Sequence, residues 1–221
     1  MVNHNLSIQI TERDQQILSF INEFGFCELK HLNKKFNFNS PRNNQILKRL
    51  IKAGLINYEK IFHQRPAIYY LTRKGAQLTE LPPMKKIPLA KYNHDLFLID
   101  TYLKLKHLYP QTAWISERQL VRDKHLAGVG QRGHLPDGIL VFPDGKQIAI
   151  EVELTIKSKA RLEKILKTYI SLFHYQEVWY YCTDIVANLL YNLAIKMPFI
   201  KVNLLQSLLQ DTHETIETLS S

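Results

Sequence analysis

The chain has 221 residues, of which 45% are hydrophobic and 22% are charged, and these proportions exclude a globally disordered protein. The length suits one large domain or two small ones, and no apolar run reaches the roughly 20 residues that a membrane-spanning helix needs. Residues 1–9 are polar without a signal-peptide core, and the two cysteines lack CxxC spacing. We therefore expect a cytoplasmic protein with reduced thiols and no zinc site.

The formal net charge of +9 is unevenly distributed along the chain. Residues 1–90 contain 14 Lys and Arg against 6 Asp and Glu, whereas residues 91–221 contain 15 against 14. The proline-rich segment 81–90 separates the two parts and is typical of a linker. The sequence thus predicts a basic domain over 1–80 that meets a polyanion, and a nearly neutral domain over 91–221.

Helical periodicity, capping residues and strand-like alternation predict the elements of the first domain. They are a helix from Thr11 to Gly25, a helix over 28–36, a helix from Ser40-Pro41 to Ala53-Gly54, strands over 55–62 and 67–71 joined by 63–66, and a short helix after Thr72. With the phrases at 47–56 and 69–75, this order resembles the winged helix-turn-helix DNA-binding family over about residues 8–80.

The third predicted helix carries the candidate DNA contacts. Polar residues spaced by three, four and three positions line one exposed face of it: Arg42, Gln45, Arg49 and Lys52. The resemblance implies that the first three enter the major groove, whereas Lys52 and Arg65 contact phosphates. The alternative is that these are ordinary solvated charges and that the domain docks a protein partner.

The second domain is predicted to alternate helices and strands, as in an α/β core. Its predicted elements are a helix over 91–108, a segment at 114–117 after Pro110, a polar loop over 119–134, two strands on either side of Asp144-Gly145, a helix over 158–173, a strand over 177–182, a helix over 186–196 and a strand over 200–205.

Acidic residues mark the two strands around Asp144-Gly145. Asp137 precedes the first strand, and in the second strand Glu151 and Glu153 share one face while the isoleucines and valine share the other. Pairing of the strands would bring the three carboxylates together. Such a cluster repels itself unless a hard cation such as Mg²⁺ or Mn²⁺ neutralises it, so the pattern indicates a metal-dependent phosphodiester site.

Pro136-Asp137, followed by Glu151-Val152-Glu153, resembles the core motif of the PD-(D/E)XK (restriction-endonuclease-like) superfamily. Glu153 stands where that superfamily has lysine. The resemblance implies that Asp137 and Glu151 hold Mg²⁺ or Mn²⁺, with Glu117 as an upstream carboxylate and Glu153 as a further ligand or base. A lysine just beyond the strand could take the missing role, and the candidates are Lys157, Lys159 and Lys164.

Each acidic residue also has an ordinary structural interpretation. Asp137 could be a turn residue after proline, and Glu151 and Glu153 could form the solvent face of an edge strand. His94 and His134 are expected to face solvent or to make structural hydrogen bonds rather than to bind an ion.

A winged helix joined to this core resembles two groups from mobile DNA: plasmid mobilisation relaxases with a restriction-endonuclease-like domain, and the replication-relaxation proteins. Beyond the winged helix, the likeness is carried by residues 93–96, Trp114 with Glu117, residues 136–138 and residues 150–155. It implies double-stranded DNA at an origin of transfer or replication as the partner, metal-dependent nicking in the relaxase case, and a second copy or relaxosome-type proteins as further partners. Two alternatives remain open: a non-catalytic regulator with a decayed nuclease core, and an assembly factor whose winged helix binds protein.

Overall fold

The structure is a computed structural model that describes residues 9–38, 41–128, 134–156, 158–172 and 174–210. The chain divides into two compact units, Met1–Leu89 and Ala90–Ser221, and their boundary falls within the segment 81–90. Each unit contains its own sheet, so the fold is mixed α/β. Among the described helices, none combines the length and the apolar character that crossing a bilayer requires.

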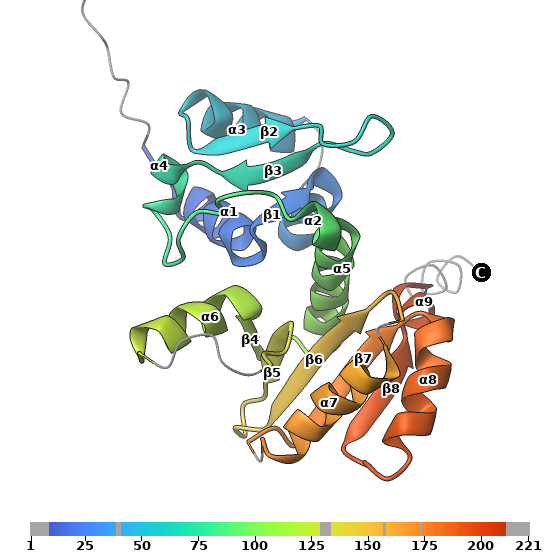
Figure 1. Cartoon of the computed structure of the whole chain (residues 1–221). Coiled ribbons are helices and arrows are strands. Elements are labelled where there is room, and N and C mark those ends of the chain that lie inside the picture. The colour runs from blue at the N-terminus through green and yellow to red at the C-terminus, as the bar shows by residue number, and fades with distance from the viewer. Residues whose placement is uncertain (1–8, 39–40, 129–133, 157, 173, 211–221) are drawn as a thin grey trace, which may run out of the picture. The chain divides into compact units, whose positions relative to one another are not determined.

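In the first unit, short helices surround a three-stranded antiparallel sheet of order β1-β3-β2 (Figure 1). The elements are α1 (Glu12–Phe24), β1 (Phe26–Glu28), α2 (Leu29–Phe36), α3 (Arg42–Lys52), β2 (Ile56–Glu59), β3 (Ile68–Leu71) and α4 (Arg73–Ala76). The core is formed where α1 packs on β1 and β3, and Ile17, Leu18 and Ile21 of α1 are completely buried there.

Local capping explains where α1 begins and ends. The side chain of Thr11 accepts a hydrogen bond from the Asp14 N–H, and the Asp14 carboxylate accepts one from the Thr11 N–H at 2.9 Å. Gly25, with φ of 83°, terminates the helix. Strand β1 follows at once and was not predicted, because three residues are too few to show an alternating pattern.

In the second unit, a five-stranded mixed sheet has the order β4-β5-β6-β7-β8 (Figure 1). The elements are α5 (Tyr92–Leu108), β4 (Ala113–Ser116), α6 (Glu117–Leu126), β5 (Gly138–Val141), β6 (Gln147–Glu153), α7 (Lys159–Ile170), β7 (Glu177–Cys182), α8 (Asp184–Ala194), β8 (Ile200–Leu204) and α9 (Leu205–Gln210). Strands β4, β5 and β6 are antiparallel, whereas β7 and β8 run parallel to β6 because helices α7 and α8 provide the crossover connections.

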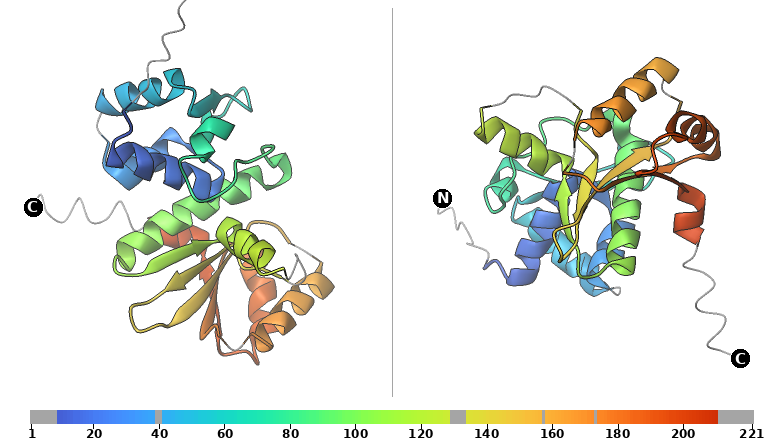
Figure 2. Two further views of the ribbon diagram at one scale, coloured as in Figure 1. Left: turned by 90° about the vertical axis from the view of Figure 1, so that its left-hand side faces the viewer. Right: turned by 90° about the horizontal axis from the view of Figure 1, so that it is seen from below.

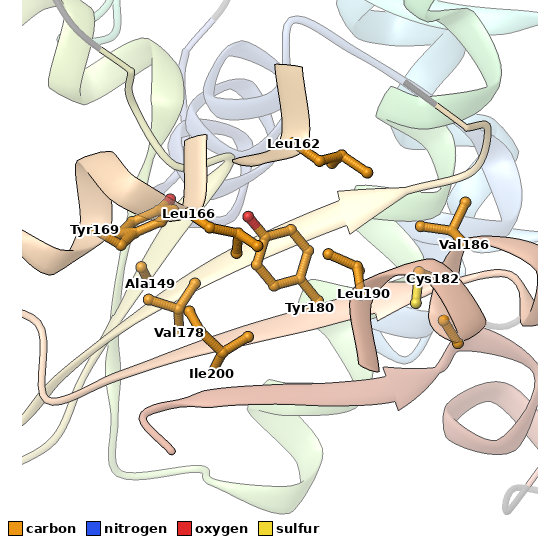
Figure 3. Close-up of a cluster of buried hydrophobic side chains, with 11 residues drawn as sticks. Ala149, Leu162, Leu166, Tyr169, Val178, Tyr180, Cys182, Val186, Leu190 and Ile200 are labelled. Carbon is orange, nitrogen blue, oxygen red and sulfur yellow. The ribbon is translucent and has the colours of Figure 1, made fainter. Parts of the chain in front are cut away.

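Helices cover both faces of this sheet (Figure 2). On one face, Ala149, Val178 and Tyr180 pack against α7 and α8 in a single buried cluster (Figure 3). On the other face, β6 packs against α5, which in turn contacts α9. Because β6 is a central strand buried on both sides, its acidic residues do not lie on an edge.

Helix α6 corrects one prediction. Residues 119–134 were expected to form a polar loop, but Glu117–Leu126 is helical. Ser116 begins the helix by accepting a hydrogen bond from the Gln119 N–H, and Gly128, with φ of 70°, lies just beyond its end. Residues 117–126 contain no glycine or proline, so polarity alone was a poor guide to their conformation.

Candidate functional site

Asp137 and Glu151 lie close together beside the β5–β6 strand pair. The pairing of these strands ends at Gly138 and Ile150; Asp137 immediately precedes Gly138, and Glu151 immediately follows Ile150. The exposed fractions of the two residues are only 8% and 4%. Both line one pocket, and the charge of Asp137 contributes to raising the pKa of Glu151, so the two buried carboxylates are near neighbours.

A row of polar residues continues from this pair in both directions. On the β4 side, the Glu117 N–H donates to the Asp137 carbonyl oxygen at 3.1 Å. On the β7 side, Tyr180 pairs with Glu151 in parallel register. The Glu117 carboxylate is more exposed than the other two and lies 3.3 Å from the Lys91 Nζ. Glu117 thus lies next to the buried pair but is neutralised separately.

Helix α5 brings an imidazole to Asp137. His94 Nε2 lies 3.1 Å from Asp137 Oδ2, and His94 Nδ1 lies 2.9 Å from Asp95 Oδ1. Burial lowers the pKa of His94, but the hydrogen bonds to the two aspartates outweigh burial and raise it to about 10. Burial likewise raises the pKa of Asp137, but the hydrogen bond and charge of His94, with the Val152 N–H, hold it below its ordinary value.

Glu151 has its own pair of hydrogen-bonding partners. His134 Nε2 lies 2.5 Å from Glu151 Oε1, and the Tyr169 hydroxyl donates to the same oxygen. Burial, together with the nearby charge of Asp137, nevertheless raises the pKa of Glu151. The two acids are therefore split, one more acidic and one less acidic than usual, as expected for carboxyls that share a dry site.

These contacts use one oxygen of each carboxylate. Asp137 Oδ2 accepts from both His94 and the Val152 N–H at 2.8 Å, and Glu151 Oε1 is bonded to both His134 and Tyr169. Within the described residues, no hydrogen bond is made to Asp137 Oδ1 or Glu151 Oε2. Each side chain is thus oriented by the protein through one oxygen and has a second oxygen available to accept a hydrogen bond or coordinate a cation.

The carboxylates open into a pocket of about 790 Å³. Its walls carry charges of both signs, with Lys91 and Arg161 as cationic members near the acidic floor. Glu153, which is 5% exposed and lies on the same face of β6 as Glu151, also lines it. The remaining lining residues are Ala90, His94, Glu117, Val121, His134, Leu135, Asp137, Glu151, Thr155 and Ile156.

The described residues do not form a ready-made metal cage. Among them, no three His, Cys, Asp or Glu side chains are grouped so that they could hold a metal ion together. Asp137 Oδ1 and Glu151 Oε2 are available as ligands for a hard divalent cation, and such ions prefer carboxylate oxygens. Lys157, the first candidate for the missing lysine, lies outside the described residues.

The residues of α3 that were predicted to contact DNA differ in their surroundings. Gln45 and Lys52 are exposed, and so is Arg65 between β2 and β3. Arg49 instead reaches back to α1, where its Nη2 lies 2.5 Å from Oδ1 of the buried Asp14. The side chain of Arg42 is not among those described, although its backbone begins the helix.

The sequence did not connect His94, His134 or Tyr169 with the two buried carboxylates that they contact. Of the two expectations for the histidines, exposure to solvent or structural hydrogen bonds, the structure shows hydrogen bonds to Asp137 and Glu151. The one signal in the sequence for the role of His94 is the aspartate that follows it, because Asp95 hydrogen-bonds the imidazole and fixes its orientation. On α3, Lys48 is exposed next to the restrained Arg49.

No known protein family matches this chain, and no curated protein has a detectably similar sequence.

Proposed function

We propose that this protein binds double-stranded DNA of a mobile element, at an origin of transfer or replication, and nicks it in a metal-dependent reaction. The observation that carries the proposal is the placement of Asp137 and Glu151: both are buried, both line one pocket beside the β5–β6 strand pair, and each is oriented through a single oxygen. Two such carboxylates at the floor of a polar pocket suit an ion that acts on phosphate esters.

The order of elements supports this proposal. From α5 to β7, the second unit runs helix, strand, helix α6, two strands, helix and parallel strand. Apart from α6, which is inserted between β4 and β5, this is the order of the restriction-endonuclease-like core that the sequence motif resembles. In the first unit, three helices and a β2–β3 strand pair with a connecting turn follow the order of a winged helix-turn-helix domain.

The chain's own residues would divide the chemistry between them. Asp137 and Glu151 would hold Mg²⁺ or Mn²⁺, which when bound supplies an activated water and withdraws charge from the phosphate. His94 keeps Asp137 ionised and fixed, so the carboxylate needs no reorganisation when an ion arrives. Arg161 and Lys91, on the pocket wall, would bind the DNA phosphates that flank the reacting bond.

The first unit would bring the DNA. Its exposed polar residues on α3, Gln45, Lys48 and Lys52, would face the major groove and its phosphates, while Arg65 would contact the backbone beside it. Arg49, held on Asp14, would orient α3 rather than contact a base.

A nicking assay tests the proposal. Supercoiled plasmid carrying the element's origin should become open circle with Mn²⁺ or Mg²⁺ and stay supercoiled in EDTA. Glu151→Gln should abolish nicking, whereas Glu163→Gln, the same change on an exposed part of α7, should not. Equal nicking by Glu151→Gln and the wild type would contradict the assignment.

A second candidate function is a non-catalytic regulator of replication or transcription that retains the core without its reaction. The observation in its favour is that no three described ligand-type side chains group for a metal, and that Glu153 replaces the lysine of the superfamily motif. This candidate predicts salt-sensitive binding to origin DNA that Asp137→Asn and Glu151→Gln leave unchanged, with no open-circle product under any metal condition.

A further inference from the structure

Tyr169 brings a hydroxyl to the acidic pair from a helix that covers the sheet. It lies in the second half of α7, is 3% exposed, and donates a hydrogen bond to Glu151 Oε1. Its ring belongs to the apolar cluster that also contains Leu162 and Leu166 of the same helix (Figure 3). Packing therefore explains the ring, but not the presence of a hydroxyl group.

A hydroxyl in this cluster is costly unless it has a partner. The neighbouring Tyr180 provides the contrast, because its buried Oη has no hydrogen-bond partner among the described residues. Figure 3 shows the hydroxyl oxygens of Tyr169 and Tyr180 on the same side of the cluster, away from Val178 and Ile200. Tyr169 differs from Tyr180 because its hydroxyl donates a hydrogen bond to the carboxylate of Glu151.

The two groups that contact Glu151 Oε1 differ in how they donate. A phenol hydroxyl carries one proton that it can donate, and the hydroxyl of Tyr169 directs it at this oxygen. The imidazole of His134 on the same oxygen has a donor role that depends on its tautomer.

We infer that Tyr169 is a positioning residue for Glu151: its hydroxyl fixes Oε1 of the buried carboxylate and leaves Oε2 to bind the divalent cation. The inference rests on the proposed function, and it assigns to α7 a role that the acidic motif itself does not contain. Because the N-terminal part of α7 also carries Arg161 on the pocket wall, the docking of one helix sets both the ligand and a cationic contact.

The competing explanation is that Tyr169 merely fills the cluster. A filler predicts that Tyr169→Phe changes the free energy of unfolding alone, since the ring is kept. A positioning residue predicts weaker cation binding in the folded protein, on the order of 10–100-fold, as is typical when a hydrogen-bond partner of a metal ligand is removed.

The first experiment examines the hydrogen bond without metal. In the proton NMR spectrum of the full chain, the buried Tyr169 hydroxyl should give a slowly exchanging downfield resonance. We expect it to vanish in Tyr169→Phe, to move in Glu151→Gln, and to persist in Tyr175→Phe, a matched control whose ring lies 6.0 Å from that of Tyr169. Absence of the resonance from the wild type, or its indifference to Glu151→Gln, overturns the inference.

The second experiment measures Mn²⁺ affinity by the EPR signal of the free ion, well below the unfolding temperature of each variant. Tyr169→Phe should raise the Kd about 10–100-fold, lower kcat for nicking and leave the KM for DNA unchanged, while Tyr175→Phe should match the wild type. Equal Kd values in Tyr169→Phe and the wild type overturn this inference alone. Failure of the wild type to nick despite binding Mn²⁺ overturns the proposed function alone, and failure to bind Mn²⁺ overturns both.

Discussion

Each unit of the molecule buries an aspartate beside a basic side chain, Asp14 beside Arg49 and Asp137 beside His94. The two aspartates differ in how many of their carboxylate oxygens are hydrogen-bonded. Asp14 uses both of its oxygens, one on Arg49 and the other on the backbone and hydroxyl of Thr11. Asp137 receives His94 and the Val152 N–H on one oxygen only. A carboxylate whose oxygens are all occupied fastens helices together, whereas one that keeps an oxygen available at a pocket can bind something else.

The largest expected effect separates the two aspartates. Asp137→Asn should reduce nicking by more than ~100-fold, because an ion at this position contributes several kcal/mol to the transition state. It should leave the protein folded, since asparagine still accepts from the Val152 N–H. Asp14→Asn should do the reverse, lowering the unfolding temperature while the folded fraction nicks at the normal rate. Rates normalised to folded protein by circular dichroism decide the matter.

Arg49 and Lys48 sharpen the comparison within α3. Arg49→Met should destabilise the first unit by about 1–3 kcal/mol, because it leaves the buried Asp14 carboxylate without its charged partner. Lys48→Met should change stability by no more than about 0.5 kcal/mol, because Lys48 is exposed. We expect weaker DNA binding from Lys48→Met at full stability. Urea unfolding and fluorescence anisotropy on origin DNA measure the two quantities, and the opposite ranking would return Arg49 to the DNA surface.

The contact between His94 and Asp137 should make the free energy of unfolding depend on pH. Because the pKa of His94 is raised from 6.5 to about 10 on folding, its contribution to stability is complete below pH 6.5 and is lost as the pH rises through 10. The wild type should therefore lose unfolding temperature between pH 7 and pH 10 more steeply than His94→Asn does. Parallel curves for the two proteins would show that the imidazole gains no proton on folding.

The smallest effects are expected at the exposed basic residues. Lys52→Ala and Arg65→Ala should each weaken DNA binding modestly and reduce the slope of log K against log salt by about one, as loss of one phosphate contact does. Lys124→Ala, on the second unit, serves as a charge-matched control. A slope that is unchanged in both variants would place the DNA elsewhere.

The acidic hairpin was predictable because its signals are local. The turn at Asp144-Gly145 and the alternation along β6 determine which side chains share a face, and both are visible in a dozen consecutive residues. Glu151 and Glu153 could be assigned to one face, although not to a central buried strand. That distinction depends on β7, which joins the sheet only after a helical connection.

The partners of the carboxylates were not predictable, because each comes from a separate part of the chain. His94 reaches Asp137 across 43 residues, and Tyr169 reaches Glu151 across 18. In its own helix, Tyr169 has the same inward spacing as Leu162 and Leu166, so periodicity identifies it only as a core residue. Arg49 likewise fits the exposed face of α3 by spacing, and only the packing of α1 diverts it.

The turn between β5 and β6 has a consequence for the distant pocket. Phe142 donates its N–H to the Lys146 carbonyl at 2.8 Å, and Gly145 adopts φ of 85°, so the loop closes with one definite length. A slip of β6 by one residue would turn each of its side chains to the other face of the sheet, and the burial of this strand and its pairing with β7 oppose such a slip. One amino acid added at the exposed tip of the hairpin should therefore be accommodated in the turn, whereas one added within β6 should displace Glu151 from the pocket.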